Sequence, residues 1–145
     1  MAGPNPSGVS APLSYLLLTL GHLWMLPVSI IGILWALATG CKPVRVDGDL
    51  AVYFVARPGW PAYWWFRKFG FAGFTLGTAI TFVEVKYLWN QRIIRHEKRH
   101  VTQCMYQGVF SLITYPAASL LAVIQGKHHY HDNLYEVDAR AHEGE

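Results

Sequence analysis

The sequence predicts a mainly helical α+β fold with an apolar helix near its N-terminus. A long uncharged apolar run comes early in the chain, two short runs rich in β-branched and aromatic residues follow it, and helical patterns fill the second half. The 145 residues have room for one domain, because a typical domain takes about 100 to 150 residues. We expect a flexible lead over residues 1–12, a membrane-embedded helix over 13–40 and one small domain over 41–145.

The composition favours contact with lipid or with other proteins. Apolar residues make up 52% of the chain and charged residues 14%, whereas about a quarter of the residues are charged in soluble domains. The formal net charge is +3, and the basic residues mostly flank apolar runs instead of forming one polar face. This pattern argues against nucleic acid as a partner. The two cysteines are too few to define a disulfide framework.

The segment from Leu13 to Gly40 is a candidate transmembrane helix. It is almost continuously apolar, and as a helix it exceeds the roughly 30 Å hydrocarbon core of a bilayer. It lacks the charged start and the short apolar region of a signal peptide, so we expect it to be retained. Pro27 removes a backbone donor near its middle and predicts a kink. The segment is then either one bent span or, if the helix breaks, a re-entrant hairpin or an interfacial helix.

The placement of charges predicts the orientation of this segment. No charged residue precedes Lys42, and Lys42 and Arg45 follow the apolar run directly. By the positive-inside tendency, the N-terminus lies outside and the rest of the chain lies in the cytoplasm.

Short strands and an aromatic segment are expected next. Residues 50–56 and residues 74–84 are rich in β-branched and aromatic side chains, and each run predicts one strand. Between them, residues 58–69 combine tryptophans with basic residues. Such a segment is typical of a membrane-interface belt, or of a small aromatic core under a loop.

Three helical segments follow. The pattern predicts a helix over residues 86–107, ending or bending near Gly108. An apolar run over 109–124 comes next, interrupted by Pro116 and short of the roughly 20 residues that a membrane span needs. A final short helix is expected over 133–141.

The first of these helices carries the motif His96-Glu97-Lys98-Arg99-His100. Residues four apart lie on one face of a helix, so both imidazoles can bind one ion. Zinc takes neutral nitrogen ligands at about 2.1 Å, and a catalytic site keeps a position for water with a base beside it. Glu97 lies next to His96 on the helix rim and is the expected base. The motif therefore predicts a hydrolytic zinc site.

A catalytic zinc generally takes three protein ligands, so one more must come from further along the chain. Glu136 is the expected third ligand, because the pattern DNLYEVDARA places it at the start of the final helix with one face inward. The alternative third ligands are His128, His129, His131 and Cys104.

The segments HEKRHVTQ and YHDNLYEVDARA resemble the gluzincin metallopeptidases, and more closely small bacterial proteins with a HExxHxxQ helix and a closing DNxxExxA segment. The resemblance covers about residues 70–141. It implies a minimal zincin-like unit of short strands, the motif helix, an apolar helix and a C-terminal helix with the third ligand. It implies that His96, His100 and Glu136 bind zinc, that Glu97 activates water, and that the protein belongs to the bacterial inner membrane.

The resemblance also assigns supporting residues and reveals one departure. Gln103 and Asn133 would be structural supports. Many gluzincins carry an acidic residue four positions after the third ligand, where this chain has Arg140. The carboxylate that orients a ligand histidine must then come from elsewhere, and Asp132 and Asp138 are the candidates.

The expected activity is hydrolysis of peptide bonds. Zinc lowers the pKa of water toward neutrality, Glu97 takes the proton, and the metal polarises the peptide carbonyl. The developing oxyanion needs a donor, for which the candidates are Tyr130, His131 and Tyr135. The edge of the strand expected over 74–84 can pair with an extended protein or peptide substrate near the membrane surface.

The zinc site also constrains the topology. His96 and Glu136 must lie within a few ångströms of one ion, so residues 109–124 cannot cross the membrane once between them. We expect this run to pack under the site as a core helix, or to enter the membrane and return, with Pro116 bending it.

Two other functions fit parts of the sequence. The apolar and aromatic excess fits a structural or assembly subunit that contacts neighbouring membrane subunits and has a residual or structural metal site. The pairs HxxxH at 96–100 and HHxH at 128–131 are similar to the histidine boxes of membrane di-iron oxygenases, although the box spacing and the number of spanning helices fall short. The bound metal, one zinc or two irons, separates the oxygenase from the peptidase.

Overall fold

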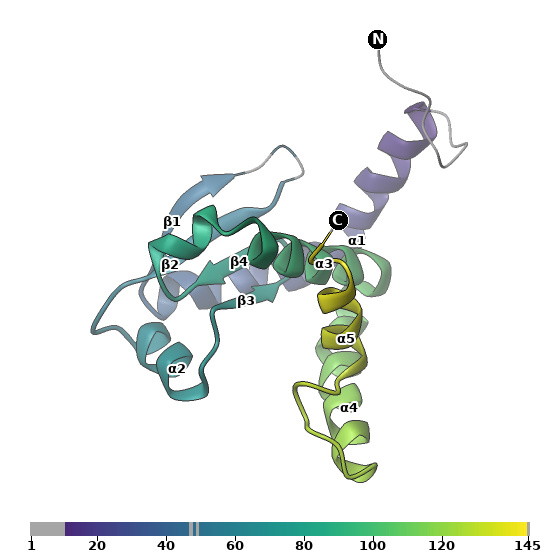
Figure 1. Ribbon diagram of the computed structural model, residues 1–145. Coiled ribbons are helices and arrows are strands. Elements are labelled where there is room, and N and C mark those ends of the chain that lie inside the picture. The colour runs from purple at the N-terminus through teal and green to yellow at the C-terminus, as the bar shows by residue number, and fades with distance from the viewer. Residues whose placement is uncertain (1–10, 47, 49, 145) are drawn as a thin grey trace.

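Helices pack around a small mixed sheet in the computed structural model of the protein (Figure 1). The structure describes residues 11–46, 48 and 50–144. The fold is α+β and mostly helical, with an apolar N-terminal helix, as the sequence predicts. The flexible lead expected over 1–12 lies outside the described residues as far as residue 10, and the first helix begins at Ala11.

Helix α1 runs from Ala11 to Ala38 and passes through Pro27 without interruption. The break that a re-entrant hairpin requires is therefore not formed. The second half of α1 packs against the sheet and against helix α3 (Gln91–Gln107), and Met25 and Val28 are fully buried there. The first half extends beyond the rest of the molecule (Figure 1), and most of its leucines are exposed.

The sheet has four strands in the order β1-β2-β4-β3. The β1–β2 and β3–β4 pairs are antiparallel, and β2 and β4 are parallel. The strands are β1 (Cys41–Val46), β2 (Val52–Ala56), β3 (Gly73–Leu76) and β4 (Ala79–Phe82). Strand β3 therefore lies at one edge of the sheet.

One of the two expected strands is confirmed and the other is wrong. The strand expected over 50–56 is β2. The run 74–84 does not form one strand but most of the hairpin β3–β4, with Thr75 opposite Ile80. Gly77 causes the turn, because its φ of 62° is a conformation that glycine adopts at little cost.

The aromatic segment 58–69 forms a helix that the sequence did not predict, α2 (Pro61–Phe69). Its start has a physical reason, since proline is favoured in the first turn of a helix. The ring of Trp65 packs against Trp35 of α1 at 5.7 Å and against Phe74 of β3 at 5.4 Å. The inner face of α2 thus forms the small aromatic core, while Trp64 on its outer face is exposed.

Helix α3 (Gln91–Gln107) carries the HExxH motif. The helix expected to start at residue 86 starts at Gln91 instead, after the short 3-10 helix η1 (Val85–Trp89). Asn90 explains this boundary, because its side-chain oxygen accepts a hydrogen bond from Ile93 N at 3.3 Å and caps the new helix.

Alternate residues of β2 face opposite sides of the sheet and anchor two apolar clusters. Tyr53 packs in the cluster that includes Val101 of α3, and Phe54 packs in the cluster that includes Phe66 of α2. Helix α3 is therefore fixed to one face of the sheet, which fixes the position of its histidines.

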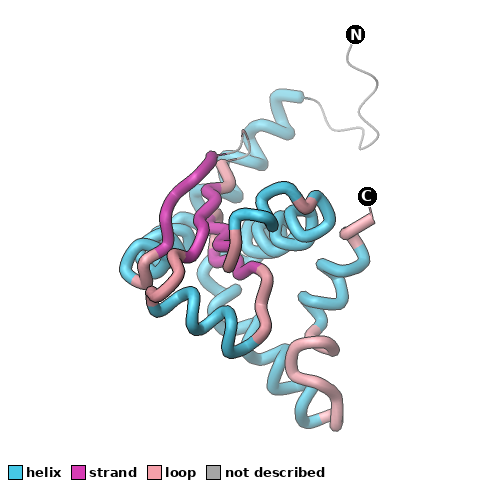
Figure 2. Tube along the Cα trace, turned by 60° about the vertical axis from the view of Figure 1, so that its left-hand side comes forward, coloured by secondary structure: helices cyan, strands magenta, loops and turns pink. Residues whose placement is uncertain are grey.

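The chain bends at Gly108 through the 3-10 helix η2 (Gly108–Phe110) into α4 (Ser111–Ile124), and α5 (Leu134–Ala141) returns beside α4 (Figures 1 and 2). Of the two arrangements expected for 109–124, the core helix is wrong, and the segment that enters the membrane and returns stays a prediction. Of the α4 side chains, all within the described part of the chain, only Ala122 is buried. The final helix expected over 133–141 is confirmed as α5.

Two helical segments within the described residues, Pro12–Ala38 and Gln91–Ile124, are long and apolar enough to cross a membrane. The second joins α3, η2 and α4. The exposed apolar side chains of these segments lie along the whole of α1, where Leu26, Ile30 and Leu34 of its second half are also exposed, and along α4.

Candidate metal centre

Helix α3 brings the imidazoles of His96 and His100 together. The residues are one helical turn apart, and their Nε2 atoms lie 3.3 Å from each other. Two ligands at about 2.1 Å from a tetrahedral ion would lie about 3.4 Å apart. The spacing of the two nitrogens therefore suits a shared ion.

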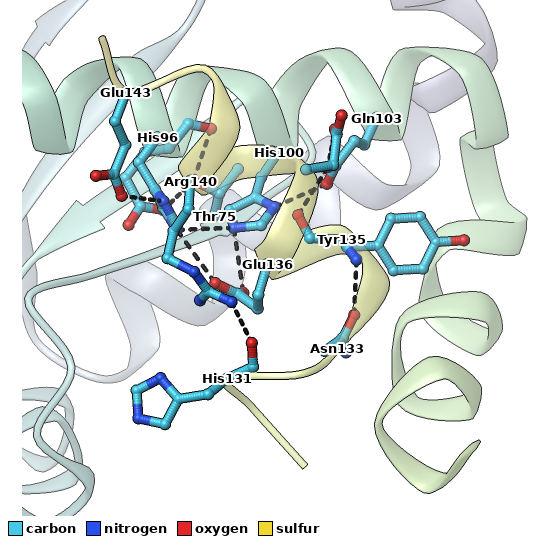
Figure 3. A network of polar contacts seen from close by, with 12 residues as sticks. Thr75, His96, His100, Gln103, His131, Asn133, Tyr135, Glu136, Arg140 and Glu143 are labelled. Atoms are coloured by element: carbon cyan, nitrogen blue, oxygen red, sulfur yellow. Dashed lines mark hydrogen bonds and ion pairs between the residues drawn. The ribbon is translucent and has the colours of Figure 1, made fainter. Parts of the chain in front are cut away.

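Helix α5 adds the carboxylate of Glu136 to this pair. Its Oε2 lies 3.2 Å from His96 Nε2, and its Oε1 lies 3.2 Å from His100 Nε2 (Figure 3). The ligand atoms of the three residues all lie within 4.8 Å of one another, and the Glu136 side chain is buried. The structure thus brings together the three residues that the sequence predicts as ligands.

The polar atoms of this group fit a cation. His96 donates from Nδ1 to a carboxylate and His100 donates from Nδ1 to an amide oxygen, so in the neutral rings both Nε2 atoms carry a lone pair. Among the described residues, the buried Oε2 of Glu136 has no hydrogen-bond partner. Three acceptors converging in a buried place are unfavourable unless a positive charge lies between them. His96, His100 and Glu136 could therefore hold a metal ion.

The surroundings of Glu136 favour its ionised form. Burial acts to raise the pKa of Glu136, but hydrogen bonds from His100 and His96, when their Nε2 atoms are protonated, and from the Tyr115 hydroxyl outweigh burial and lower this pKa overall. A carboxylate must be deprotonated to bind a metal, so this environment favours the binding form.

A chain of polar contacts orients His100. Its Nδ1 donates to Gln103 Oε1 at 2.8 Å, and Gln103 Nε2 donates to Asp138 Oδ2 at 2.7 Å. Arg99 binds both oxygens of Asp138, at 2.7 and 3.0 Å, and these bonds lower the pKa of Asp138 to about 2. Asp138, one of the two carboxylates predicted to orient a ligand histidine, thus acts on His100 through Gln103.

His96 is oriented by a residue that sequence reasoning missed. Its Nδ1 lies 3.0 Å from Oε1 of Glu143, which follows the end of α5 (Figure 3). The one available signal was spacing, since Glu143 lies seven residues, about two helical turns, after Glu136. That signal is weak because α5 ends at Ala141.

Glu97, the predicted base, points toward the sheet. Its side chain is buried, and Thr75 Oγ1 of β3 donates to Glu97 Oε2 at 2.7 Å. Gly73 leaves the space that the carboxylate occupies, because a Cβ built on it would lie 2.5 Å from Glu97 Oε1. Strand β3 therefore positions Glu97 in two ways: the Thr75 hydroxyl donates a hydrogen bond to its carboxylate, and Gly73 leaves space for that carboxylate.

A cavity of about 350 Å³ contains the three candidate ligands and Glu97. Strand β3, helix α3, helix α4 and the segment before α5 form its walls. Its apolar lining includes Trp65, Phe71, Phe74, Leu112 and Pro116. The polar group thus lies in a largely apolar recess beside the edge of the sheet.

Of the three predicted oxyanion donors and the second predicted orienting carboxylate, two residues line this cavity and two do not. Tyr130 and Tyr135 both line it, and burial, followed by the charge of Glu136, raises the pKa of Tyr130 so that its hydroxyl keeps its proton as a donor. His131 lies in the exposed turn before α5, where its carbonyl accepts a hydrogen bond from Arg140. Asp132 accepts from His128 N at 2.8 Å and closes the same turn, so it does not orient a ligand.

The alternative third ligands do not join the group. The ligand atoms that converge among the described residues come from His96, His100 and Glu136. Cys104 lines the cavity, but its sulfur contacts Ser111 Oγ at 3.1 Å. The remaining alternatives, His128, His129 and His131, cluster with one another in the turn before α5.

Helix α4 supports Glu136 through Tyr115, which the sequence did not predict, and through its contact with Asn133, which the resemblance names as a structural support. The Tyr115 hydroxyl donates to Glu136 Oε1. Asn133, fully buried, caps α5 by accepting from Tyr135 N at 2.9 Å and donates to Ser119 Oγ of α4 at 2.7 Å. These bonds fix the start of α5, from which Glu136 projects.

No protein-family model, curated protein or solved structure matches this chain. Its function is therefore inferred from its own residues and their geometry.

Proposed function

We propose that this protein is a membrane-associated, zinc-dependent peptidase with a minimal zincin-like unit similar to that of the gluzincins. One observation carries the proposal. His96 and His100 on α3 and Glu136 on α5 present acceptor atoms within 4.8 Å of one another, in the same cavity as the buried Glu97. This is the arrangement that metal-assisted hydrolysis needs: three ligands, a base and a recess for substrate.

Each residue of the site has a separate role in the proposed hydrolysis. A bound zinc ion supplies a Lewis acid that polarises a carbonyl and acidifies water. Glu97 accepts the proton of the attacking water and passes it to the leaving amine. Thr75 keeps the Glu97 carboxylate in place through its 2.7 Å hydrogen bond. Tyr130, which lines the cavity and keeps its proton, donates to the developing oxyanion.

The proposed substrate is an extended segment of a protein or peptide. Strand β3 lies at the edge of the sheet and lines the cavity, so a substrate strand can add to it through main-chain hydrogen bonds. The aromatic and aliphatic lining next to the metal group favours a large apolar side chain at the cleaved bond.

The proposed location is the bacterial inner membrane, with the C-terminal domain in the cytoplasm. Exposed leucines on the first half of α1 and exposed apolar residues along α4 support contact with lipid. Lys42 and Arg45 directly after α1 support the orientation.

The test uses the full chain purified in detergent, with zinc measured per chain and hydrolysis measured on unfolded casein. We expect one bound zinc and slow hydrolysis. Glu97→Gln should keep the zinc and lower the hydrolysis rate by about 100-fold to 10,000-fold, the usual contribution of a general base. Hydrolysis that survives Glu97→Gln, or a wild-type chain that binds no zinc, would contradict the proposal.

A second function, that of a non-catalytic subunit of a larger membrane complex, is favoured by the exposed apolar faces of α1 and α4. Arg140, at the position where many gluzincins have an acidic residue, also suits a chain without catalysis. The two functions differ in one readout. If the protein is a non-catalytic subunit, Glu97→Gln should change neither the hydrolysis rate nor the zinc content. If it is a peptidase, Glu97→Gln should lose hydrolysis and keep the zinc.

A further inference from the structure

The residues after α5 fold back onto α3 and bring a third carboxylate to the metal group. Glu143 is the residue concerned, and its side chain is 15% exposed. Its Oε1 lies 3.0 Å from His96 Nδ1, and its Oε2 forms an ion pair with Arg92. Its main-chain oxygen accepts from Arg95 Nε at 2.8 Å. Three contacts therefore hold Glu143 against α3.

The two histidines of the group are supported in different ways. His100 donates to the neutral amide of Gln103, with Asp138 one step further away. His96 donates directly to a carboxylate. A carboxylate on the far nitrogen fixes the tautomer and the ring plane of a ligand histidine and makes its other nitrogen a stronger donor to the metal.

Other groups do not supply this function to His96. Arg140, which stands four residues after Glu136, has no acceptor atom on its side chain and donates to the carbonyl of His131 (Figure 3). Asp138 is already bound by Arg99 and Gln103. Among the described residues, Glu143 is the acidic group that contacts His96 Nδ1.

We propose that Glu143 is the positioning residue of His96: it holds the ring with Nε2 toward the metal, and Arg92 and Arg95 fix Glu143 in turn. The proposal rests on the proposed function, since it assigns a role at the same metal site. It makes the segment that follows α5, through Glu143, part of the proposed metal site.

Zinc affinity of the purified full chain tests this proposal, measured by competition with a chromophoric chelator. We expect Glu143→Ala to weaken zinc binding by about 10-fold to 100-fold, the usual cost of losing such a partner. Glu143→Gln should weaken zinc binding less than Glu143→Ala does, because its amide oxygen can still accept a hydrogen bond from His96 Nδ1. Glu84→Ala is the matched control: it removes a carboxylate paired with Arg67 and Lys86, outside the cavity, and should leave the affinity unchanged.

A second readout separates positioning from stability. The visible absorption of the cobalt(II)-loaded chain reports ligand geometry, and Glu143→Ala should change it while Glu84→Ala should not. If Glu143→Ala does not fold, Arg92→Ala, which frees one side of Glu143 and leaves His96 untouched, should weaken zinc binding by a smaller factor. Affinity and cobalt spectra that are the same for the Glu143 variants, the Arg92 variant and the control would overturn this proposal alone. A wild-type chain without zinc affinity would overturn the proposed function as well.

Discussion

The two halves of the candidate metal centre are held in place by different forces. Helix α3 carries His96 and His100 on one face and buries Ile94 and Val101 in the apolar core beneath the sheet. Helix α5 carries Glu136, but Leu134 and Val137 on the same helix are exposed. Apolar burial thus fixes the histidine half.

Helix α5 is attached to α3 and α4 largely through polar groups. Gln103 donates to Tyr135 O at 3.0 Å, and Arg99 binds Asp138 through two hydrogen bonds. The carboxylate half of the site therefore depends on hydrogen bonds and, in the proposed function, on the metal itself. The comparison predicts a stable half-site on α3 and a more labile closing element, α5.

The largest expected effect is the loss of a ligand from either half. Glu136→Ala and His100→Ala should each weaken zinc binding by more than about 1,000-fold, because binding at a structural or catalytic site needs its full ligand set. The halves should differ in thermal stability of the metal-free chain. Only His100→Ala alters the helix that is packed on the sheet, so it should lower the melting temperature more. Circular dichroism measures the melting temperatures of the two metal-free variants. Equal values would contradict the expected difference between the histidine half and the carboxylate half.

The next largest effect is a loss of hydrolysis when the position of Glu97 against β3 is disturbed. Gly73→Ala forces a methyl group into the space of Glu97 Oε1, since the added Cβ would lie 2.5 Å away. A displacement of about 1 Å at a catalytic group can cost roughly 100-fold in rate, so hydrolysis should fall by that order while zinc content stays at one per chain. Gly48→Ala, whose Cβ meets no atom within 4 Å, is the control. Full hydrolysis by Gly73→Ala would show that Glu97 does not act from this position.

The smallest effect follows from removing the metal. Without a cation, the three acceptors of His96, His100 and Glu136 no longer hold α5 to α3. Chelation of zinc should therefore speed the amide hydrogen exchange of residues 134–141 by about tenfold, corresponding to roughly 1.4 kcal/mol of local stability. Exchange in β2, which lies in the core, should hardly change. Equal acceleration in both segments would mean that the metal stabilises the whole fold and not its closing element.

The candidate ligands that share one helix, or that follow a motif spacing, could be predicted from the sequence. His96 and His100 follow from helical periodicity, and Glu136 follows from the pattern of the last helix. The contacts of Thr75, Tyr115 and Glu143 could not be predicted, because each joins the site from a different element. Their positions depend on the hairpin at Gly77, the bend at Gly108 and the end of α5, which local sequence patterns do not determine.

The elements of the fold also divide into those that local sequence patterns predict and those that they do not. The long apolar helix, the strand β2 and the helix α5 were predictable from periodicity and β-branched content. The α2 helix was missed because an aromatic run with flanking prolines is ambiguous between loop and helix. A core position was one of two arrangements expected for helix α4, because apolar sequence alone does not show whether a helix is buried in the protein or exposed.

X-ray absorption at the zinc edge of the purified wild-type chain measures directly which atoms bind the metal. We expect one zinc with two imidazole nitrogens and carboxylate or water oxygens at about 2.0 to 2.2 Å, from His96, His100 and Glu136. A sulfur ligand at about 2.3 Å, which would have to come from Cys104 or Cys41, or a spectrum without histidine ligands, would contradict this expectation.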